Sequence, residues 1–308
     1  MTMRSLVFLM LLGMFSTACN TKKQPSNEDH QTETEKLYFG QHTPGVIPEI
    51  FAPEVVSIEG RYEHGISFSP DLKEVYFGAN YEDHDPSIYF SKLEDGKWTT
   101  PRIVDFTKGK KVGEMHPFVS PNGERIHFAA HDSFTLPHHK ESVKAWYVDR
   151  LENSWGEATQ LSSPVNDDFV FYSNEAKNGD LFYTNVSKRK MYYAPKKNGK
   201  YREVYEIGTR GFHGFISPSQ DYLVINARNQ NEEERKSDIY VYFKKKDGTW
   251  SEPINLGSDV NSNFSETCPS ITPDGKFLFF GRYNEKRGLS NFYWVSTDVI
   301  EKVRPEEF

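Results

Sequence analysis

Residues 116–128, HPFVSPNGERIHF, decide the fold of this chain. They read as two strands joined by a tight turn. Ser-Pro-Asn-Gly favours a type I turn because proline presets φ at the second position, asparagine tolerates the third and glycine closes the turn. Similar stretches recur at residues 67–77, 215–225 and 269–280. The first two stretches are about fifty residues apart, as are the last two, and this spacing is typical of propellers and other repeat arrays.

The interval between the second and third stretches is about twice as long, so we expect one further copy inside it. Residues 169–174 with 179–183 fit that copy, although the proline is missing. A second signal also recurs: a hairpin turn that delivers an aromatic residue onto the next strand, at residues 94–98, 152–155, 197–201 and 246–250. Each unit therefore contains four strands.

Four-stranded units repeated around an axis form a β-propeller, and five units are identified here. The last unit has three strands before the chain almost ends, so its outer strand is missing. A lone strand predicted at residues 50–58 can replace it by pairing with residues 291–296, which closes the ring and removes both sheet edges. We therefore expect an all-β fold, a propeller of five four-stranded blades closed by an N-terminal strand. The alternative is six blades, with a degenerate blade in residues 37–60 or 129–175.

The 308 residues suffice for one large core, and residues 37–308 are expected to form a single propeller domain. Residues 1–18 carry Arg4 before a short apolar run, which is typical of a signal peptide. Residues 19–36 are polar and predict a disordered tether.

The signal peptide ends in residues 16–19, Ser-Thr-Ala-Cys, which resemble the lipobox of bacterial lipoproteins. The usual leucine three residues before the cysteine is Ser16 here. The resemblance implies cleavage before Cys19 and lipidation of its thiol. The alternative is an ordinary cleavable signal with a chance cysteine. The other cysteine, Cys268, would then have no partner for an intrachain disulfide, and it reads as a small buried residue.

The Ser-Pro-Asp/Asn-Gly turns and the Asp-Gly-x-Trp hairpins resemble TolB-type WD-like propeller repeats over nearly all of residues 50–300. The resemblance implies a fold but no particular activity, because proteins with these repeats include periplasmic scaffolds, non-catalytic domains of peptidases and a class of pectin-fragment lyase.

In a propeller, the loops at 80–86, 130–143, 227–238 and 282–289 lie on the face where each first strand begins. We expect this face to bind the ligand, since long and diverse loops on a rigid scaffold commonly do so. Counting back six residues from each turn Ser or Thr predicts acids at the channel mouth in four of the five units. With neighbouring polar residues, the candidate ligand-binding set is Glu63, His64, Glu114, His116, Asp167, Asp168, His213, Arg228, Glu266 and Arg282.

Net charge is -7 and the basic residues are scattered, so nucleic acid is not an expected partner. No metalloprotease, nucleophile-elbow, phosphate-loop or paired-cysteine motif is present, and no catalytic residue, cofactor or metal site is assigned. A divalent cation is the one group that acids and imidazoles at the mouth could ligate.

The expected function is that of a monomeric binding or scaffold module of the bacterial cell envelope. It would be held at the outer membrane by the lipid anchor only, and it would bind a protein, peptide or glycan. The alternative is a carbohydrate-active enzyme, like a glycosidase or lyase, that uses the acids and histidines of the mouth.

Acids gathered at the mouth would repel one another, and partial burial would add to the effect. The sequence therefore predicts raised pKa values for one or more of Glu63, Glu114, Asp167 and Glu266. For Glu114→Gln it predicts unchanged or improved stability at neutral pH.

Overall fold

The computed structural model describes residues 32–82, 84–132, 143–152, 154–229, 236–284 and 287–308. Apart from α1 (Glu33–Lys36), the 3-10 helix η1 (Val165–Asp167) and α3 (Asp298–Glu301), its regular structure is β-strand. None of the helices in these ranges is long and apolar enough to cross a membrane. The predicted signal peptide and Cys19 lie outside the described residues. The predicted tether overlaps α1, which a capping box between Thr32 and Glu35 stabilises.

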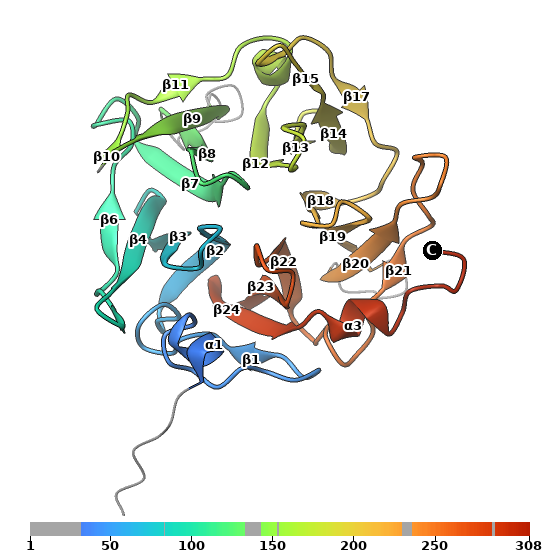
Figure 1. Cartoon of the computed structure of the whole chain (residues 1–308), viewed down its shortest axis with the longest axis horizontal. Helices are drawn as coiled ribbons and strands as arrows, with labels where there is room; N and C mark the ends of the chain where they lie inside the picture. The colour runs from blue at the N-terminus through green and yellow to red at the C-terminus, as the bar shows by residue number, and fades with distance from the viewer. Residues whose placement is uncertain (1–31, 83, 133–142, 153, 230–235, 285–286) are drawn as a thin grey trace, which may run out of the picture.

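The strands surround a central axis in consecutive antiparallel groups, and each group runs from the axis to the rim (Figure 1). The first group contains β2 (Arg61–Phe68), β3 (Glu74–Tyr81), β4 (Ser87–Glu94), β5 (Lys97–Trp98) and β6 (Arg102–Val104). The next contains β7 (Gly113–Val119), β8 (Arg125–His131), β9 (Lys144–Leu151), β10 (Ser154–Trp155) and β11 (Thr159–Gln160). Then follow β12 (Val170–Glu175), β13 (Leu181–Asn185), β14 (Lys190–Ala194) and β17 (Tyr205–Glu206), beside the hairpin of β15 (Lys196–Lys197) and β16 (Lys200–Tyr201).

The remaining strands complete the ring. One group contains β18 (Phe212–Ile216), β19 (Tyr222–Arg228), β20 (Ser237–Phe243) and β21 (Ile254–Asn255). The last contains β22 (Ser265–Ile271), β23 (Phe277–Asn284), β24 (Leu289–Ser296) and β1 (Glu49–Ile50). One parallel pair, Tyr62 with Ser290, joins the first and last groups into a nine-stranded sheet.

The N-terminal segment pairs with the last group, as the missing outer strand predicted. In β1, Glu49 pairs with Trp294 and Ile50 with Tyr293. The strand is shorter than the predicted strand at 50–58 and begins one residue earlier. The chain leaves the ladder after Phe51, because Ala52 has a φ of 40° and its carbonyl accepts hydrogen bonds from the turn that follows.

Aromatic and aliphatic side chains fill the space between neighbouring groups. One buried cluster between the first two groups includes Tyr76, Phe106 and Phe128. Tyr38 and Phe51, which precede the first group in sequence, are fully buried beside the ring of Trp294. The N-terminal segment therefore belongs to the core and is not an appendage of it.

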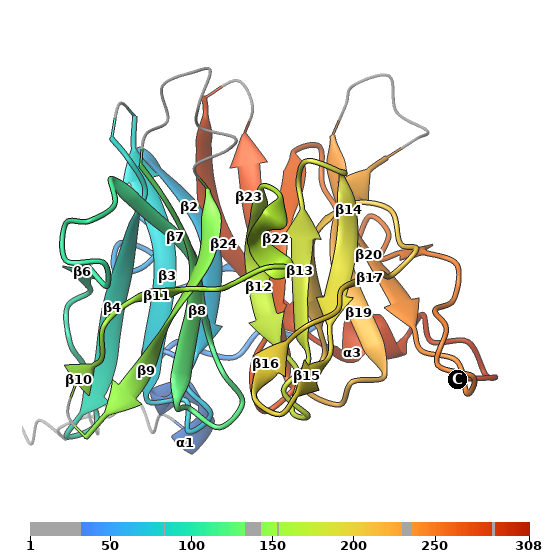
Figure 2. The same cartoon turned by 90° about the horizontal axis from the view of Figure 1, so that it is seen from above.

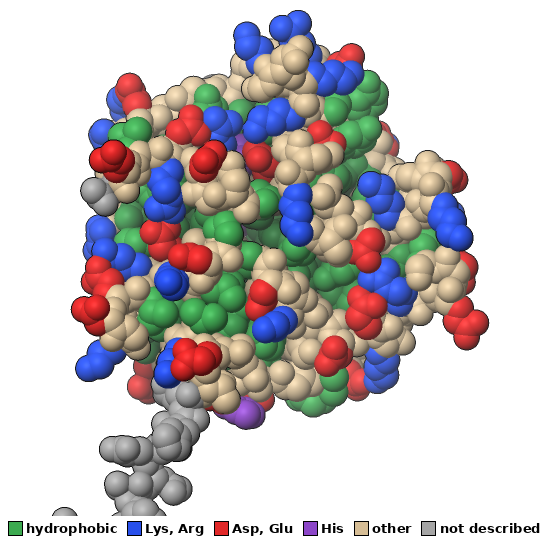
Figure 3. Space-filling model, in the orientation of Figure 1, with side chains coloured by type: hydrophobic (Ala, Val, Ile, Leu, Met, Phe, Trp, Pro, Cys, Tyr) green, Lys and Arg blue, Asp and Glu red, His purple; other side chains and the backbone are tan. Residues whose placement is uncertain are grey.

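The two faces of the ring differ as the repeat predicted. The Ser-Pro turns lie on the face that carries α1 and α3, and the second strands end on the opposite face (Figure 2). Viewed from the turn face, hydrophobic side chains gather around the centre of the molecule (Figure 3). A cavity of about 120 Å³ opens there, lined by the turn prolines and by Phe68, Phe118 and Phe215.

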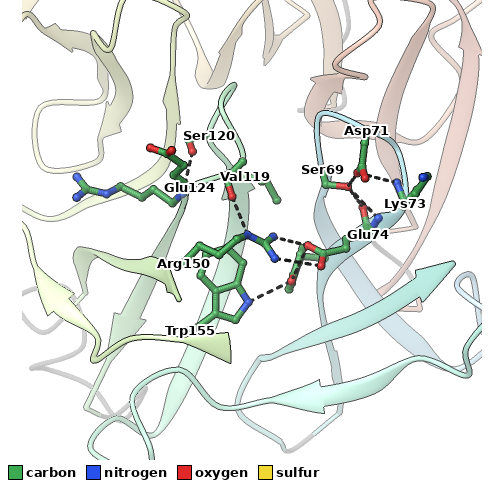
Figure 4. Close-up of polar contacts among 12 residues, drawn as sticks. Ser69, Asp71, Lys73, Glu74, Val119, Ser120, Glu124, Arg150 and Trp155 are labelled. Atoms are coloured by element: carbon green, nitrogen blue, oxygen red, sulfur yellow. Dashed lines mark hydrogen bonds and ion pairs between the residues drawn. The ribbon is translucent and has the colours of Figure 1, made fainter. Parts of the chain in front are cut away.

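The turn of residues 120–125 is closed as its sequence predicts. Gly123 N–H donates to the Ser120 carbonyl at 2.8 Å, and Gly123 has a φ of 74°, which glycine adopts without strain. Ser120 Oγ accepts from Arg125 N–H at 2.9 Å and donates to Asn122 Oδ1 at 2.7 Å. The hydroxyl of Ser69 makes equivalent bonds to Asp71 and Glu74 (Figure 4), and those of Ser217 and Thr272 accept the same backbone bond.

Arg150, in β9, links two groups of the ring. Its guanidinium pairs with both carboxylate oxygens of Glu74 on β3 (Figure 4). Its Nε donates to the Gly123 carbonyl at 2.8 Å. The guanidinium also lies 4.3 Å from the centre of the Trp155 ring. A bidentate pair of this kind fixes orientation as well as distance, so it sets the relation of the two groups.

Candidate functional site

The first strand of every group contains a β-bulge at the same position. The ladder register shifts within β2, β7, β12, β18 and β22. One residue at each shift has a positive φ: Gly65, His116, Tyr172, His213 and Cys268. A bulge with a left-handed residue redirects the local side chain. We call these five residues the bulge ring.

Four members of the bulge ring are not glycine, although a left-handed φ costs other residues about 1–3 kcal/mol. Gly65, the exception, provides space for its neighbour. A Cβ atom at Gly65 would lie 3.0 Å from His116 Nδ1 and 3.2 Å from His116 Cα. The other positions hold imidazole, phenol and thiol groups. Backbone strain of this kind is concentrated at functional sites in proteins.

Two histidines of the bulge ring, His116 and His213, lie together with the predicted His64 at the axis. The His116 ring lies 4.8 Å from that of His64 and 5.5 Å from that of His213. Phe171 packs against the rings of His116 and His213 at 5.3 and 4.9 Å. His64 and His116 are 3% and 8% exposed, and each has a buried Nδ1 without a hydrogen-bond partner among the described residues. These two nitrogens are therefore not used in hydrogen bonds within the part of the chain that the structure describes.

Asn226 on β19 orients two members of the ring. Its Oδ1 lies 2.7 Å from His213 Nδ1 and accepts the Cys268 backbone N–H at 3.3 Å. Because the Cys268 N–H must donate, the amide oxygen faces both groups, so His213 Nδ1 carries the proton. The His213 Nε2 lone pair is then left for a ligand.

One ligand atom from each of His116, His213 and Cys268 lies within 4.8 Å of the other two. Burial lowers the pKa of His64 to about 3 and that of His213 to about 4. Burial and the neighbouring imidazoles hold the pKa of His116 well below its usual value. Burial also raises the pKa of Cys268 to about 12. At neutral pH the site therefore presents neutral imidazoles and a protonated thiol.

Glu63 is buried in the sheet and is not presented at the channel mouth, contrary to the sequence expectation. Its Oε1 accepts from Ile58 N–H at 2.8 Å and from Arg61 Nη2 at 2.9 Å. Its Oε2 accepts from Phe292 N–H at 3.2 Å. The carboxylate therefore ties the segment before β2 to the last strand group.

Glu114 is placed in the same way. Its two carboxylate oxygens accept the N–H groups of Phe106 and Thr107 at 3.1 and 2.7 Å, which fixes the segment before β7. Both oxygens have dedicated backbone donors, so this acid is architectural. These contacts lead us to expect that Glu114→Gln is destabilising, the reverse of the prediction from the sequence.

Glu266, fully buried, completes the set. Its Oε1 accepts from Ser262 N–H and Oγ at 3.2 and 2.6 Å and from Arg282 Nε at 2.9 Å. Burial raises the pKa of all three glutamates, and their hydrogen bonds offset part of that rise. The raised pKa expected of these residues is present at Glu63, Glu114 and Glu266, but it arises from burial and not from repulsion among the acids.

Asp167, the acid expected at the channel mouth in the third unit, does not occupy the position equivalent to Glu63, Glu114 and Glu266. The turn there begins at Ala176, whose N–H donates to the Asp180 carbonyl at 2.8 Å, and not at Ser173. Counting back six residues from Ala176 gives Val170 in place of Asp167. Asp167 lies exposed in η1, and the carboxylate of Asp168 binds Asn185 and Lys188 at 2.8 and 2.9 Å.

The two predicted arginines take different places. Arg228 ends β19 and is exposed. Arg282 is held by Glu266, by the Val260 carbonyl at 2.9 Å and by the Tyr293 ring, whose centre lies 4.2 Å from the guanidinium. Arg282 therefore braces the last strand group.

Sequence reasoning missed four residues of the site: Phe171, Tyr172, Asn226 and Cys268. A usable signal exists, since every bulge-ring residue lies four positions before the first turn residue, Ser69, Ser120, Ala176, Ser217 or Thr272. The residue four positions before the first turn residue belongs to the bulge ring. The residue six positions before it is a buried glutamate in the first, second and last strand groups. Tyr172 donates from its hydroxyl to the Pro269 carbonyl at 2.9 Å and closes the ring toward β22.

A small chamber continues from the histidines toward the turn face. It measures about 10 Å³ and is lined by Gly65, His116, Tyr172, Asn174 and Ser270, among others. Phe118 and Phe215 border both this chamber and the larger cavity on the turn face. An apolar constriction therefore separates the polar site from the cavity on the turn face.

No protein-family model and no curated protein matches the chain. Among solved structures, arabinanase Arb43A of Bacillus subtilis is 11% identical with a TM-score of 0.50, covering 75% of this chain and 92% of that one. The GH43 endo-arabinanase of Bacillus licheniformis is 12% identical with a TM-score of 0.50, covering 78% and 94%. The fold is all-β and propeller-like. At these identities the likeness concerns the fold alone.

TolB from Acinetobacter baumannii is also similar, at 14% identity and a TM-score of 0.46. The match covers 75% of this chain and 54% of TolB, so it spans about half of the TolB length.

Proposed function

We propose that this chain is a non-catalytic binding module of the bacterial cell envelope. Its site would be the channel formed by the bulge ring, and it would take the end of a peptide, protein segment or glycan from the face opposite the Ser-Pro turns. The observation that carries this proposal is the bulge ring itself. Imidazole, phenol and thiol groups occupy strained backbone positions at the axis, while the acids are bound within the sheets.

We infer a ring of five blades that β1 closes. Five bulges, each followed by a turn and an antiparallel meander, support this number. The six-blade alternative needs a further meander within residues 37–60 or 129–175. In the described parts of those ranges the strands are β1 and members of the groups already given.

The enzyme alternative is less well supported. A glycosidase needs two carboxyl groups that face a shared substrate about 5–10 Å apart. Glu63 and Glu114 have backbone donors on both oxygens, and Glu266 is 0% exposed. Their positions therefore favour an architectural role over proton transfer to a sugar.

The aromatic residues beside the histidines fit a binding role. Tyr62 lies 5.5 Å from the His64 ring and 5.4 Å from the Tyr283 ring, and Phe171 flanks His116. Aromatic faces and neutral imidazoles bind apolar faces and hydrogen-bonding groups together, which peptide ends and sugar rings both provide. The net charge of -7 makes nucleic acid an unsuitable partner.

A thermal-shift screen against glycans and peptides tests the binding role. A specific ligand at a hundredfold excess over its Kd stabilises by roughly 2.7 kcal/mol. We expect that His213→Ala and Phe171→Ala abolish the shift, whereas a change of the exposed His42 leaves it intact. Hydrolysis of an arabinan or pectin fragment that Glu114→Gln abolishes would support the enzyme alternative and overturn this proposal.

The lipid anchor is part of the proposal and has its own test. The lipobox-like segment 16–19 implies that Cys19→Ser releases the protein from the membrane fraction, with unchanged thermal unfolding. A variant that still pellets with membranes after a salt wash would contradict anchoring through Cys19.

A further inference from the structure

We propose that the channel binds one zinc-type transition-metal ion through His116, His213 and Cys268. This inference rests on the proposed channel site and gives it a cofactor. The ligand of the module would then complete the coordination of the ion. The sequence reasoning assigned no metal to this chain.

The donor set fits such an ion. Imidazole nitrogen and thiolate sulfur are ligands that Zn²⁺ prefers, at about 2.0–2.1 and 2.3 Å. Cys268 carries a protonated thiol before the ion binds, so binding replaces its S–H bond with a metal–sulfur bond and releases the proton to solvent. Ligand atoms of one tetrahedral ion then stand about 3.5 Å apart. The three atoms here lie within 4.8 Å of one another, so side-chain rotations that close the site by about 1 Å suffice. Three protein ligands leave a fourth position for a donor atom of the ligand, as open zinc sites do.

The surroundings have the properties of a metal site. Zinc-bound histidines commonly donate their second N–H to an oxygen that fixes the tautomer. His213 does this through Asn226 Oδ1 at 2.7 Å, and the same oxygen accepts the backbone N–H of Cys268 at 3.3 Å. One buried amide, 3% exposed, therefore orients two of the three ligands. His116 adds a buried Nδ1 with no hydrogen-bond partner among the described residues.

The bulge ring explains why the ligands come from three separate strands. His116, His213 and Cys268 lie on β7, β18 and β22, and each has the left-handed φ that turns its side chain to the axis. Gly65 occupies the same position on β2 and leaves space for the His116 ring. Ordinary extended backbone would place these three side chains elsewhere in their sheets.

Cobalt spectroscopy tests the site in the full chain carrying Cys19→Ser, which leaves Cys268 as the single thiol of the protein. We expect one Co²⁺ per chain and a sulfur-to-cobalt charge-transfer band that Zn²⁺ displaces. Because only one thiol is present, the band assigns the sulfur ligand without a further variant. A cooperatively melting chain that binds no Co²⁺ or Zn²⁺, or binds Co²⁺ without this band, overturns the proposal.

Further variants locate the nitrogen ligands. We expect His213→Gln and His116→Gln to weaken Zn²⁺ binding at least tenfold, and Cys268→Ser to abolish the band. His42→Gln removes an exposed imidazole that contacts Glu35 at 2.8 Å, and it should change neither readout. Metal affinity unchanged by all three channel variants, each shown to melt cooperatively, would overturn the assignment.

Asn226 is tested as a positioning residue. Second-shell changes commonly cost 10–100-fold in metal affinity, so we expect a loss of this size in Asn226→Ala, with a shifted cobalt spectrum. Asn226→Asp keeps an acceptor oxygen and should restore much of the affinity. Equal affinity and identical spectra in both variants would contradict this role.

The metal and the binding role can fail separately. An organic ligand that still binds the Cys268→Ser chain in the presence of a chelator would support the binding role and overturn the metal as its cofactor. If the chain binds Zn²⁺ as expected but no peptide or glycan changes its melting temperature, the metal site is retained and the proposed function is contradicted.

Discussion

Gly65 is the one glycine of the bulge ring. A substitution at this single residue tests how tightly the channel is packed around His116. Gly65→Ala adds a methyl group at a φ of 63°, 3.0 Å from His116 Nδ1. We expect it to lower the free energy of unfolding by about 1–3 kcal/mol through backbone strain and contact with His116.

Gly96 is the matched control for this change. It has a φ of 77°, and a Cβ atom there would meet nothing within 4 Å, so Gly96→Ala isolates the cost of the backbone conformation. Chemical denaturation should show a clearly larger loss for Gly65→Ala than for Gly96→Ala. Equal losses would mean that His116 moves freely.

Glu114 provides a second test at residue scale. Its hydrogen bonds predict how Glu114→Gln changes stability at neutral pH, and its raised pKa predicts how that change depends on pH. Each of its oxygens accepts one backbone N–H, and a glutamine offers only one acceptor oxygen. Leaving a buried donor unpaired costs about 1–3 kcal/mol, so we expect Glu114→Gln to be destabilised at neutral pH.

The pH dependence of this loss has a definite sign. Burial raises the folded-state pKa of Glu114, so the folded protein binds its proton more tightly than the unfolded chain does. The wild type therefore gains stability from this group as pH falls from neutral through the folded pKa, and the variant does not. Denaturation at several pH values should show the stability gap widening toward acid. A narrowing gap would mean that the folded-state pKa is lowered.

Some residues of the candidate site could be predicted from the sequence, and others could not. His64, His116 and His213 were found because the repeat placed them near the start of each first strand. Cys268 and Tyr172 were not found, because the bulge puts these residues in a left-handed conformation that favours glycine, and only Gly65 carries that signal. The glutamates were misjudged because their backbone donors come from segments without a repeat pattern.

At the scale of elements, the turns were the predictable part. Ser-Pro-Asn-Gly fixes a hairpin by local hydrogen bonds alone, so its position can be read without the rest of the chain. The third unit was misaligned by three residues because Ala176 stands where the other turns have a hydroxyl. The extent of β1 was also overestimated, since Ala52 and Glu54 adopt positive φ values that apolar composition does not reveal.

The pairing of β1 leads to a prediction at the scale of elements, that the N-terminal segment is needed to close the ring. It pairs with β24, and Tyr38 and Phe51 beside it are fully buried. Deleting residues 1–60 removes this pairing and exposes the edge of β24, so we expect aggregation or loss of cooperative unfolding. Deleting residues 1–31 keeps α1 and these contacts and should do neither. A soluble, cooperatively melting chain of residues 61–308 would contradict closure by the N-terminal segment.

At the scale of the whole molecule, the repeat determines the architecture but leaves the function to a few side chains. Arabinanases at 11–12% identity have the same all-β, propeller-like fold. One fold commonly hosts unrelated activities, so this likeness assigns none to the chain. In this chain the acids hold the strand groups together, and the axis is left to imidazole, phenol and thiol groups. The function proposed for this chain therefore depends on whether those groups bind a ligand together.

The central claim, that the bulge ring binds one metal ion at the axis, is tested most directly by X-ray diffraction. The crystals would contain the Cys19→Ser chain with Zn²⁺, and data would be recorded on both sides of the zinc absorption edge. We expect one dominant anomalous peak at the axis, about 2.0–2.3 Å from a nitrogen of His116, a nitrogen of His213 and the sulfur of Cys268. An empty channel, with zinc found only at surface carboxylates or histidines, would contradict the assignment of the bulge ring as a metal-dependent binding site.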